Sequence, residues 1–297
     1  MKTILLTGAT GFLGSHLLQY LVKKKYKVVI LKRSTSDICR IASIINHVTT
    51  YDIDKKPIEL AFKNHKIDVV MHLATFYGKK QNYENLIQTN IIFGLNLISL
   101  SIKYKIDVFI NTDTFFNNKN EIQSHLSEYT TTKKHFFEWL SLRKDSVKIA
   151  NMKIHHVYGE KDSDDKFSMW LFHELSNGNK KIKLTTGIQL RDFIYVQDVV
   201  KAYEVVMLNH QNFESMQEFN VSTGGKHTVK EFCIMMGHEI LKDSQSVKEI
   251  LLFGAKSDNP DEIMDIDNDN SSLLKLGWKP DFDLVNGIHN MIVNIKE

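Results

Sequence analysis

The first half of the chain alternates short apolar runs with longer segments in which apolar residues recur every three or four positions. The short runs are rich in Val and Ile and have the length of buried strands. Strands are expected at 2–7, 27–32, 48–51, 69–73, 108–112 and 147–154, and helices at 12–24, 83–104 and 128–143. Apolar strands that alternate with helices predict a parallel sheet, covered on both faces through right-handed crossovers.

The second half is less regular and contains turn signals such as 177–178, 223–225 and 258–260. The chain has 297 residues, of which 25% are charged and 42% are apolar, as in ordinary globular proteins. Its net charge of +3 argues neither for nor against nucleic acid, and we expect no such partner.

Cys39 and Cys233 lie far apart and outside any metal-ligand spacing, so no metal is expected. The apolar run at the N-terminus is too short for a signal sequence and is broken by Gly8. No stretch approaches the roughly 20 apolar residues that a spanning helix needs. We therefore expect a cytoplasmic protein without a membrane partner.

A glycine-rich segment, Thr-Gly-Ala-Thr-Gly-Phe-Leu-Gly at 7–14, lies between the first expected strand and the first expected helix. Gly8 permits a tight turn, Gly11 lets the backbone approach a pyrophosphate, and Gly14 lets the helix pack closely on the strand. The helix N-terminus offers free N–H groups and a positive dipole end to phosphates. This context predicts a dinucleotide-binding turn.

The end of the second expected strand distinguishes the two nicotinamide dinucleotides. An acidic residue there would accept a hydrogen bond from the ribose 2′-hydroxyl and favour NAD. This chain has Lys32, Arg33 and Ser34 instead. Two cations and a hydroxyl suit a 2′-phosphate, and the Arg33 guanidinium can bind it with two parallel hydrogen bonds. We expect NADP(H) to be favoured over NAD(H); the alternative is a solvated basic turn.

Tyr129 and Lys133 are four residues apart, on one face of an expected helix. A phenol, with a pKa of about 10, is a poor acid or base at neutral pH, and a nearby ammonium favours the phenolate. Thr112 ends an expected strand, at the edge where doubly wound sheets bind ligands. Its hydroxyl can hydrogen-bond a substrate oxygen as Tyr129 transfers a proton. We expect Thr112, Tyr129 and Lys133 to be catalytic.

Together these motifs resemble the extended short-chain dehydrogenase/reductase family, the NAD(P)-dependent nucleotide-sugar epimerases, dehydratases and reductases. They follow the family order along essentially the whole chain: 7–14, His72-Leu73-Ala74, the Thr112/Tyr129/Lys133 set, Val157-Tyr158-Gly159, 191–198, Phe219-Asn220-Val221 and 276–280.

The resemblance implies an α/β fold, with a Rossmann-type doubly wound parallel sheet and a smaller C-terminal α/β substrate-binding lobe. Residues 1–155 would form the dinucleotide-binding domain, to which the chain would return around 193–222. Residues 156–297 would form mainly the substrate-binding lobe.

The resemblance also implies roles for individual residues. Cofactor contacts would come from Gly8, Thr10, Gly11, Phe12, Leu13, Gly14, Lys32, Arg33, Asp52, Ile53, Leu73, Ala74, Thr75, Asn90, Tyr129 and Lys133. Substrate contacts would come from Thr75, Asp113, Thr114, His156, Arg191 and Lys256, with Arg191 and Lys256 near the substrate's diphosphate. A structural role is favoured for Asn90 and Asp198, packing within a strand is favoured over substrate contact for His156, and His72 is expected to belong to a strand end.

Three reactions of the family must be separated. The 4,6-dehydratases carry Thr-Asp-Glu after the fifth strand, where the two acidic residues serve as acid and base. Here the triplet is Thr112-Asp113-Thr114, and a hydroxyl cannot readily abstract a proton from carbon. Epimerases recycle hydride on a tightly bound cofactor, usually NAD, whereas Lys32 and Arg33 favour NADPH, a consumable reductant.

Within the family, the segments 111–116 and 129–133 look like the CDP-paratose and CDP-abequose synthases. This implies NADPH-dependent reduction, at C4, of a nucleotide-linked (CDP-) 4-keto-6-deoxyhexose in deoxysugar biosynthesis for surface polysaccharide such as lipopolysaccharide. A 4-epimerase with tightly bound NAD is the alternative, and a 4,6-dehydratase or a non-catalytic NADP-binding protein is less favoured. The family also implies a homodimer formed through the helices at 83–104 and 128–143.

Overall fold

The computed structural model describes residues 2–78, 82–117, 126–177 and 181–296. The chain divides into two compact units. The first comprises Met1–Ile154, Val200–Asn220 and Ser272–Trp278, and the second comprises His155–Val199, Val221–Ser271 and Lys279–Glu297. From the sequence, the boundary was expected at 155 with one return around 193–222. The short second return at Ser272–Trp278 was not expected.

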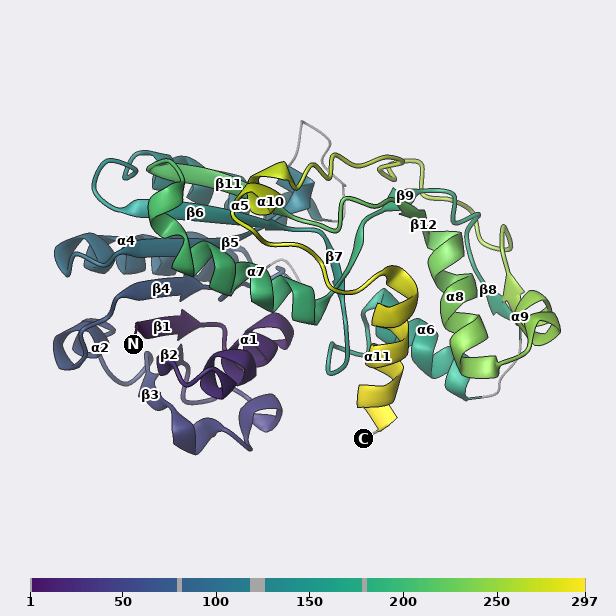
Figure 1. Ribbon diagram of the computed structural model, residues 1–297, viewed down its shortest axis with the longest axis horizontal. Coiled ribbons are helices and arrows are strands. Elements are labelled where there is room, and N and C mark those ends of the chain that lie inside the picture. Colours follow the sequence, from purple (N-terminus) through teal and green to yellow (C-terminus); the bar gives the residue numbers. More distant parts are fainter. Residues whose placement is uncertain (1, 79–81, 118–125, 178–180, 297) are drawn as a thin grey trace. The chain divides into compact units, whose positions relative to one another are not determined.

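The first unit is built on a seven-stranded sheet with the order β11-β6-β5-β4-β1-β2-β3 (Figure 1). The strands are β1 (Thr3–Thr7), β2 (Lys27–Lys32), β3 (Thr49–Asp52), β4 (Val69–His72), β5 (Val108–Thr114), β6 (Lys148–Ile154) and β11 (Met216–Val221). Neighbours from β3 to β6 pair in parallel. The strand order reverses between β1 and β4, and ligands bind at such a switch point. The predicted Rossmann-type sheet is confirmed.

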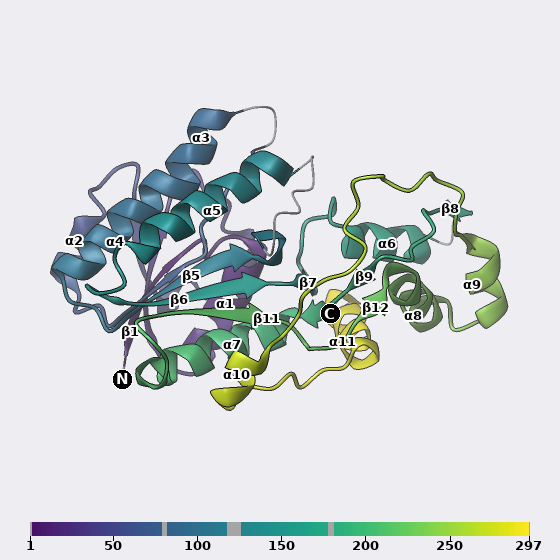
Figure 2. The ribbon, with the colours of Figure 1, turned by 90° about the horizontal axis from the view of Figure 1, so that it is seen from above.

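Helices cover both faces of this sheet, which explains why its strands are apolar throughout. Helices α2 (Glu59–Asn64), α4 (Phe93–Lys103) and α5 (Ser127–Ser141) lie on one face, and α1 (Phe12–Lys23) and α7 (Val196–Leu208) lie on the other (Figure 2). Leu5 and Phe109 pack with Leu97 of α4 and Phe136 of α5 in one cluster. Ile4 and Leu6 are also fully buried. Each such side chain stabilises the fold by about 1.5–3 kcal/mol.

One long helical segment, Tyr83–Lys103, has the length and composition of a membrane span, with a mean hydropathy of 1.3. It joins α3 (Tyr83–Ile87), a π-helical turn at Gln88–Ile92 and α4. This differs from the expectation that no stretch approaches such a span. However, Leu97 and Ile98 pack into the core cluster on the sheet. Because a core helix passes the same test of length and composition, the segment is explained as a sheet-covering helix.

The second unit contains three short strand pairs. Strand β7 (His156–Tyr158) pairs in parallel with β10 (Phe193–Tyr195), β8 (Ile182–Lys183) in parallel with β13 (Leu251–Leu252), and β9 (Leu190–Arg191) antiparallel with β12 (His227–Thr228). Its helices are α6 (Phe167–Ser176), α8 (Val229–Leu241), α9 (Ser244–Ile250) and α11 (Leu284–Lys296), while α10 (Ser271–Lys275) falls almost wholly in the first unit. Short 3-10 turns occur at Cys39–Ile41, Ile45–His47, Phe115–Asn117 and His210–Asn212.

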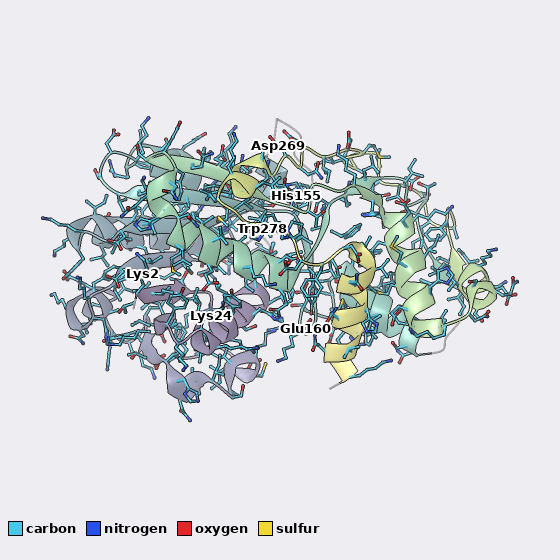
Figure 3. All side chains as sticks on the ribbon, viewed as in Figure 1. Lys2, Lys24, His155, Glu160, Asp269 and Trp278 are labelled. Carbon is cyan, nitrogen blue, oxygen red and sulfur yellow. The ribbon has the colours of Figure 1, made fainter. Side chains whose placement is uncertain are left out.

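Buried carboxylates organise the second unit. The side chain of Asp198 accepts hydrogen bonds from the backbone N–H groups of Asp281 and Phe282, at 2.9 and 3.1 Å. The Tyr195 hydroxyl donates to Glu160, labelled in Figure 3, at 2.9 Å. Asp198 therefore anchors the segment that leads into α11, in line with the structural role favoured for it.

The ends of β1 and β4 are joined by the Thr7 hydroxyl. Its Oγ1 accepts the backbone N–H groups of Leu73 and Ala74, both at 3.1 Å, and lies 2.8 Å from His72 Nδ1. Because Oγ1 already accepts two bonds, its own proton goes to Nδ1, and the ring carries its proton on Nε2. Burial, helped by the Lys133 charge, lowers the pKa of His72 to about 3. His72 is thus a neutral residue of the strand end, as expected.

Two glycines are required by close backbone contacts at this turn. Gly8 has a φ of 71°, and a Cβ there would lie 2.7 Å from Ala74 N. A Cβ at Gly14 would lie 2.0 Å from the carbonyl oxygen of Gly8. At Gly11, in contrast, the nearest described atom would be the Gly8 oxygen at 3.4 Å.

Gly14→Ala is therefore expected to destabilise the fold strongly, by about 3 kcal/mol or more, because helix α1 cannot accept the added methyl group. Gly11→Ala is the matched control: with φ −79° and ψ 176°, alanine fits the backbone and stability should change by less than about 1 kcal/mol. Urea unfolding of both variants measures the difference. Equal losses of stability would mean that the close approach of α1 to Gly8 does not limit the fold.

Candidate active site

The N-terminus of α1 fits the pyrophosphate of a dinucleotide. Gly11 is the N-cap residue, and among the described residues no side chain caps this helix and none in its first turn is acidic. The first backbone N–H groups of the helix are therefore available to an anion, next to the positive end of the helix dipole. Thr10, Phe12 and Leu13 lie in the same turn. A Cβ at Gly11 would make only an ordinary contact, 3.4 Å from the Gly8 oxygen, so packing within the protein does not require glycine there.

The basic turn after β2 differs in detail from the expectation. Lys32 lies opposite Asp52 in the β2–β3 register, and its Nζ forms an ion pair with Asp52 Oδ1 at 2.6 Å. Arg33 is exposed and has no ion pair with any residue the structure describes. Ile53 packs against the core cluster. Of the two cations expected to bind the 2′-phosphate, Lys32 is thus paired with a carboxylate, and Arg33 is the one that is not. The preference for NADP(H) stays a prediction.

Asn90 holds the segment after β4 to helix α5. Its Nδ2 donates to Phe76 O at 2.8 Å and to Thr132 Oγ1 at 3.0 Å. Its Oδ1 accepts from Phe76 N at 2.8 Å and from the Thr75 hydroxyl at 3.3 Å. With both amide groups used in this way, Asn90 has nothing left to offer a dinucleotide. Its placement among the cofactor-binding residues is thus corrected, and the structural role is the one the geometry supports.

The three predicted catalytic residues belong to the first unit, on β5 and α5. Lys133 Nζ donates to the backbone oxygen of Thr112 at 2.8 Å, and the Thr112 hydroxyl lies 2.6 Å from the hydroxyl of Tyr203. Tyr129 lies one helical turn before Lys133, and its phenol hydrogen-bonds the side chains of Thr75 and Tyr77. The rings of Tyr77 and Tyr129 pack with their centroids 4.7 Å apart.

Burial controls the protonation of this group. It lowers the pKa of Lys133 from 10.5 to about 8, although the nearby Asp113 carboxylate acts in the opposite direction. It raises the pKa of Tyr129 well above the usual value, and Tyr77 and Asp113 add to the rise. Desolvation therefore outweighs the lowering of the phenol pKa that was expected from Lys133. Tyr129 keeps its proton and is a proton donor.

Asp113 is buried next to this pair. Its Oδ1 accepts from Thr114 N and from Asn117 Nδ2, both at 2.8 Å, and its Oδ2 accepts from Asn151 Nδ2 at 2.9 Å. Burial raises the pKa of this carboxyl group. Because both oxygens are held by the protein, Asp113 acts on Tyr129 and Lys133 mainly through its charge. Thr114 is buried as well, with its hydroxyl 3.4 Å from Phe116 N.

The remaining predicted substrate residues belong to the second unit. Arg191 is buried, donates to the backbone oxygens of Leu190 and Ile263 at 2.7 and 2.6 Å, and forms an ion pair with Glu262. Glu262 therefore already pairs with the guanidinium that was expected to meet the diphosphate. Lys256 is exposed, with its Nζ 5.5 Å from the centre of the Trp170 ring. Burial and the Arg191 charge hold the pKa of His156 well below its usual value, so that ring is neutral.

Several residues of these sites were missed by sequence reasoning. Tyr203 holds the Thr112 hydroxyl from 91 positions away, and Tyr77 contacts Tyr129 from a loop without a recognisable pattern. In the second unit, the Asp192 carboxylate accepts from Thr223 N, Thr223 Oγ1, Gly224 N and Asn268 Nδ2. The turn glycines at 224–225 could have pointed to an anchoring acid, but the pattern does not say which one.

Two known enzymes are similar to this chain along its full length. The CDP-abequose synthase of Salmonella typhimurium strain LT2 is 35% identical over 296 residues and the one of Salmonella muenchen 31% identical over 295 residues. The alignments cover 97% and 98% of this chain, respectively, and 97% of each relative.

Solved structures share the fold. The UDP-glucose 4-epimerase of Thermotoga maritima with UDP-glucose superposes with a TM-score of 0.81 at 22% identity, covering 99% of this chain and 98% of the other. The UDP-glucose 4-epimerase of Thermus thermophilus in complex with NAD superposes with a TM-score of 0.78 at 20% identity, covering 99% of both chains.

The profile of the NAD dependent epimerase/dehydratase family matches residues 4–222, which include the glycine-rich turn, Thr112, Tyr129 and Lys133. This match and the full-length relatives confirm the family expected from the sequence. The chain is an NAD(P)-dependent enzyme that belongs to the NAD dependent epimerase/dehydratase family, the extended short-chain dehydrogenases/reductases.

Proposed function

We propose that the chain reduces the C4 keto group of a CDP-linked 4-keto-6-deoxyhexose with NADPH, as a step in deoxysugar biosynthesis for surface polysaccharide. The observation that supports this most directly is the arrangement of Tyr129 one helical turn before Lys133 on α5, with Lys133 Nζ bonded to the backbone oxygen of Thr112 at 2.8 Å. A reduction consumes one proton on oxygen, and a neutral phenol supplies it. The two CDP-abequose synthases that match along the full length support the choice of substrate class.

The residues divide the reaction as follows. NADPH, with its pyrophosphate at the N-terminus of α1, would supply the hydride for the new C–H bond at C4. Tyr129 gives its proton to the C4 oxygen, so that the carbonyl becomes a hydroxyl, and the Lys133 ammonium stabilises the phenolate that remains. The Thr112 hydroxyl orients the C4 oxygen, while Tyr203 fixes the rotamer of Thr112 through the 2.6 Å contact. Lys133 is itself aimed by the Thr112 carbonyl.

The other reactions of the family fit less well. Dehydration needs a base that removes a proton from carbon, and the chain has Thr114 where the dehydratases carry Glu. A 4-epimerase using tightly bound NAD is the second candidate. The Lys32–Asp52 ion pair favours it, because it weakens the case for a 2′-phosphate at this turn. Copurification of NAD without net oxidation or reduction of the sugar would establish the epimerase instead.

The test is to incubate the protein with NADPH and a panel of nucleotide-linked 4-keto sugars, to follow NADPH absorbance and to identify products by NMR. We expect consumption of NADPH with the CDP-linked 4-keto-6-deoxyhexose. Tyr129→Phe should lose about 10²–10⁴-fold in turnover and keep its affinity for the dinucleotide, because it removes the proton donor. Tyr104→Phe, which removes a phenol bonded to Glu59, is the control and should keep full activity. Near-normal turnover of Tyr129→Phe would end the proposal.

Activity is expected to fall as the pH rises through about 8. Lys133 in the folded chain loses its proton near that pH, whereas an ordinary lysine keeps it to about 10.4. Above pH 8 the neutral amine no longer stabilises the phenolate of Tyr129. The profile of kcat/KM against pH, which reports on the free enzyme, measures this. Lys133→Arg keeps its charge, so its weaker activity should lack the decline near pH 8; an unchanged basic limb would assign the decline to another group.

We also propose a homodimer formed by the helical segment Tyr83–Lys103 and α5. These helices expose Ile87, Ile92 and Trp139, at 47, 38 and 45% of their full surface. Ile87→Glu combined with Trp139→Glu is expected to give a monomer in sedimentation equilibrium, because buried charges would lack partners. Leu208→Glu, at an exposed position on α7, is the control and should leave the dimer intact. A monomeric wild-type chain would refute the dimer.

A further inference from the structure

The turn after β2 is held by a carboxylate, Asp54, that no motif in the chain singles out. Ser34 donates its backbone N–H to Asp54 Oδ1 at 2.7 Å and its hydroxyl to Asp54 Oδ2 at 2.6 Å. Two bonds from one residue fix the orientation of the carboxylate. The bonds from Ser34 also lower the pKa of Asp54, so the group is ionised at neutral pH.

The charges around this turn are balanced rather than basic. Lys32 pairs with Asp52 at 2.6 Å, and the backbone N–H of Ile53 donates to Lys32 O at 2.9 Å, so the two strand ends are tightly joined. Arg33 remains exposed, with its backbone N–H bonded to Ser36 Oγ at 3.1 Å. One exposed guanidinium and one oriented carboxylate, Arg33 and Asp54, thus flank Ser34.

Arg33 and Asp54 favour different dinucleotides. In a Rossmann-type sheet the end of the second strand meets the adenosine ribose of the dinucleotide. A 2′-phosphate needs cations and N–H or O–H donors, and here Asp54 already holds both donors of Ser34. A 2′-hydroxyl needs an acceptor, which the Asp54 carboxylate provides.

We propose that Asp54 sets the dinucleotide selectivity of this enzyme: clamped on Ser34, its carboxylate opposes the 2′-phosphate of NADP(H) and accepts from the 2′-hydroxyl of NAD(H). Arg33 acts in the other direction and attracts the phosphate. The net preference for NADP(H) or NAD(H) depends on which of the two side chains, Arg33 or Asp54, has the larger effect. The proposal rests on the proposed function only in that a nicotinamide dinucleotide is the cofactor.

The experiment measures the dissociation constants of NADP+ and NAD+ for Asp54→Asn by calorimetry. The amide has the same shape and removes the charge, so the ratio Kd(NADP+)/Kd(NAD+) should fall about tenfold at low salt, on the scale of a close charge contact near a protein surface. High salt should shrink the difference between variant and wild type. Arg33→Ala should raise the same ratio.

Asp37→Asn is the matched control. Asp37 is an exposed carboxylate three residues after Ser34 that bonds Cys39 N at 2.9 Å, so its loss changes the net charge equally. It should leave the ratio unchanged to within about twofold, because its carboxylate bonds Cys39 and not Ser34. Asp54→Ser is a second test should the first variant fold poorly, with thermal unfolding as the check.

Two results overturn the selectivity role alone: an unchanged ratio in folded Asp54→Asn and Asp54→Ser, or an equal shift in Asp37→Asn. A wild-type chain that binds neither dinucleotide overturns the proposed function and the role of Asp54 with it. A shift confined to the Asp54 variants, with both dinucleotides bound, supports the proposal whichever sugar the enzyme reduces.

Discussion

The contact between the ends of β1 and β4 is the constraint on which the rest of the candidate site depends. The Thr7 hydroxyl joins the two strand ends, and the absence of a side chain at Gly8 lets the backbone of Leu73 and Ala74 come within van der Waals contact. This closeness opens the N-terminus of α1 toward the switch point and, through Asn90, places Thr75 at the phenol of Tyr129. The anion-binding turn and the proton donor are therefore positioned by one rigid arrangement of backbone.

Burial, rather than pairing, sets the chemistry of Tyr129, Lys133 and Asp113. Each is almost fully covered, and in each case removal from water disfavours the charged form: the pKa of the phenol and of the carboxyl group rises, and the pKa of the amine falls. The Coulomb attraction between Lys133 and Asp113 partly offsets this. As a result, the Tyr129 hydroxyl keeps its proton at neutral pH, as a proton donor in a carbonyl reduction must.

Local patterns in the sequence were sufficient for the sheet, the glycine-rich turn and the Tyr129–Lys133 pair, because each of these depends on residues within one strand, turn or helix. They were insufficient wherever a contact joins distant segments. The Thr112–Tyr203 hydrogen bond spans 91 positions and the Arg191–Glu262 ion pair spans 71. The pairing of Lys32 with Asp52 depends on the register of two strands, which alternation of apolar residues does not specify. The raised pKa of Tyr129 likewise follows from packing, which no motif records.

The composition of the first unit from three separate stretches has a consequence for synthesis. Strand β11 lies beyond residue 215 and the last stretch is Ser272–Trp278, so the unit is complete only when nine-tenths of the chain has been made. During translation, the edge of the sheet at β6 therefore stays unpaired until β11 has been made. An unpaired apolar edge favours aggregation. A fragment that stops before α10 therefore lacks one of the three stretches of the first unit.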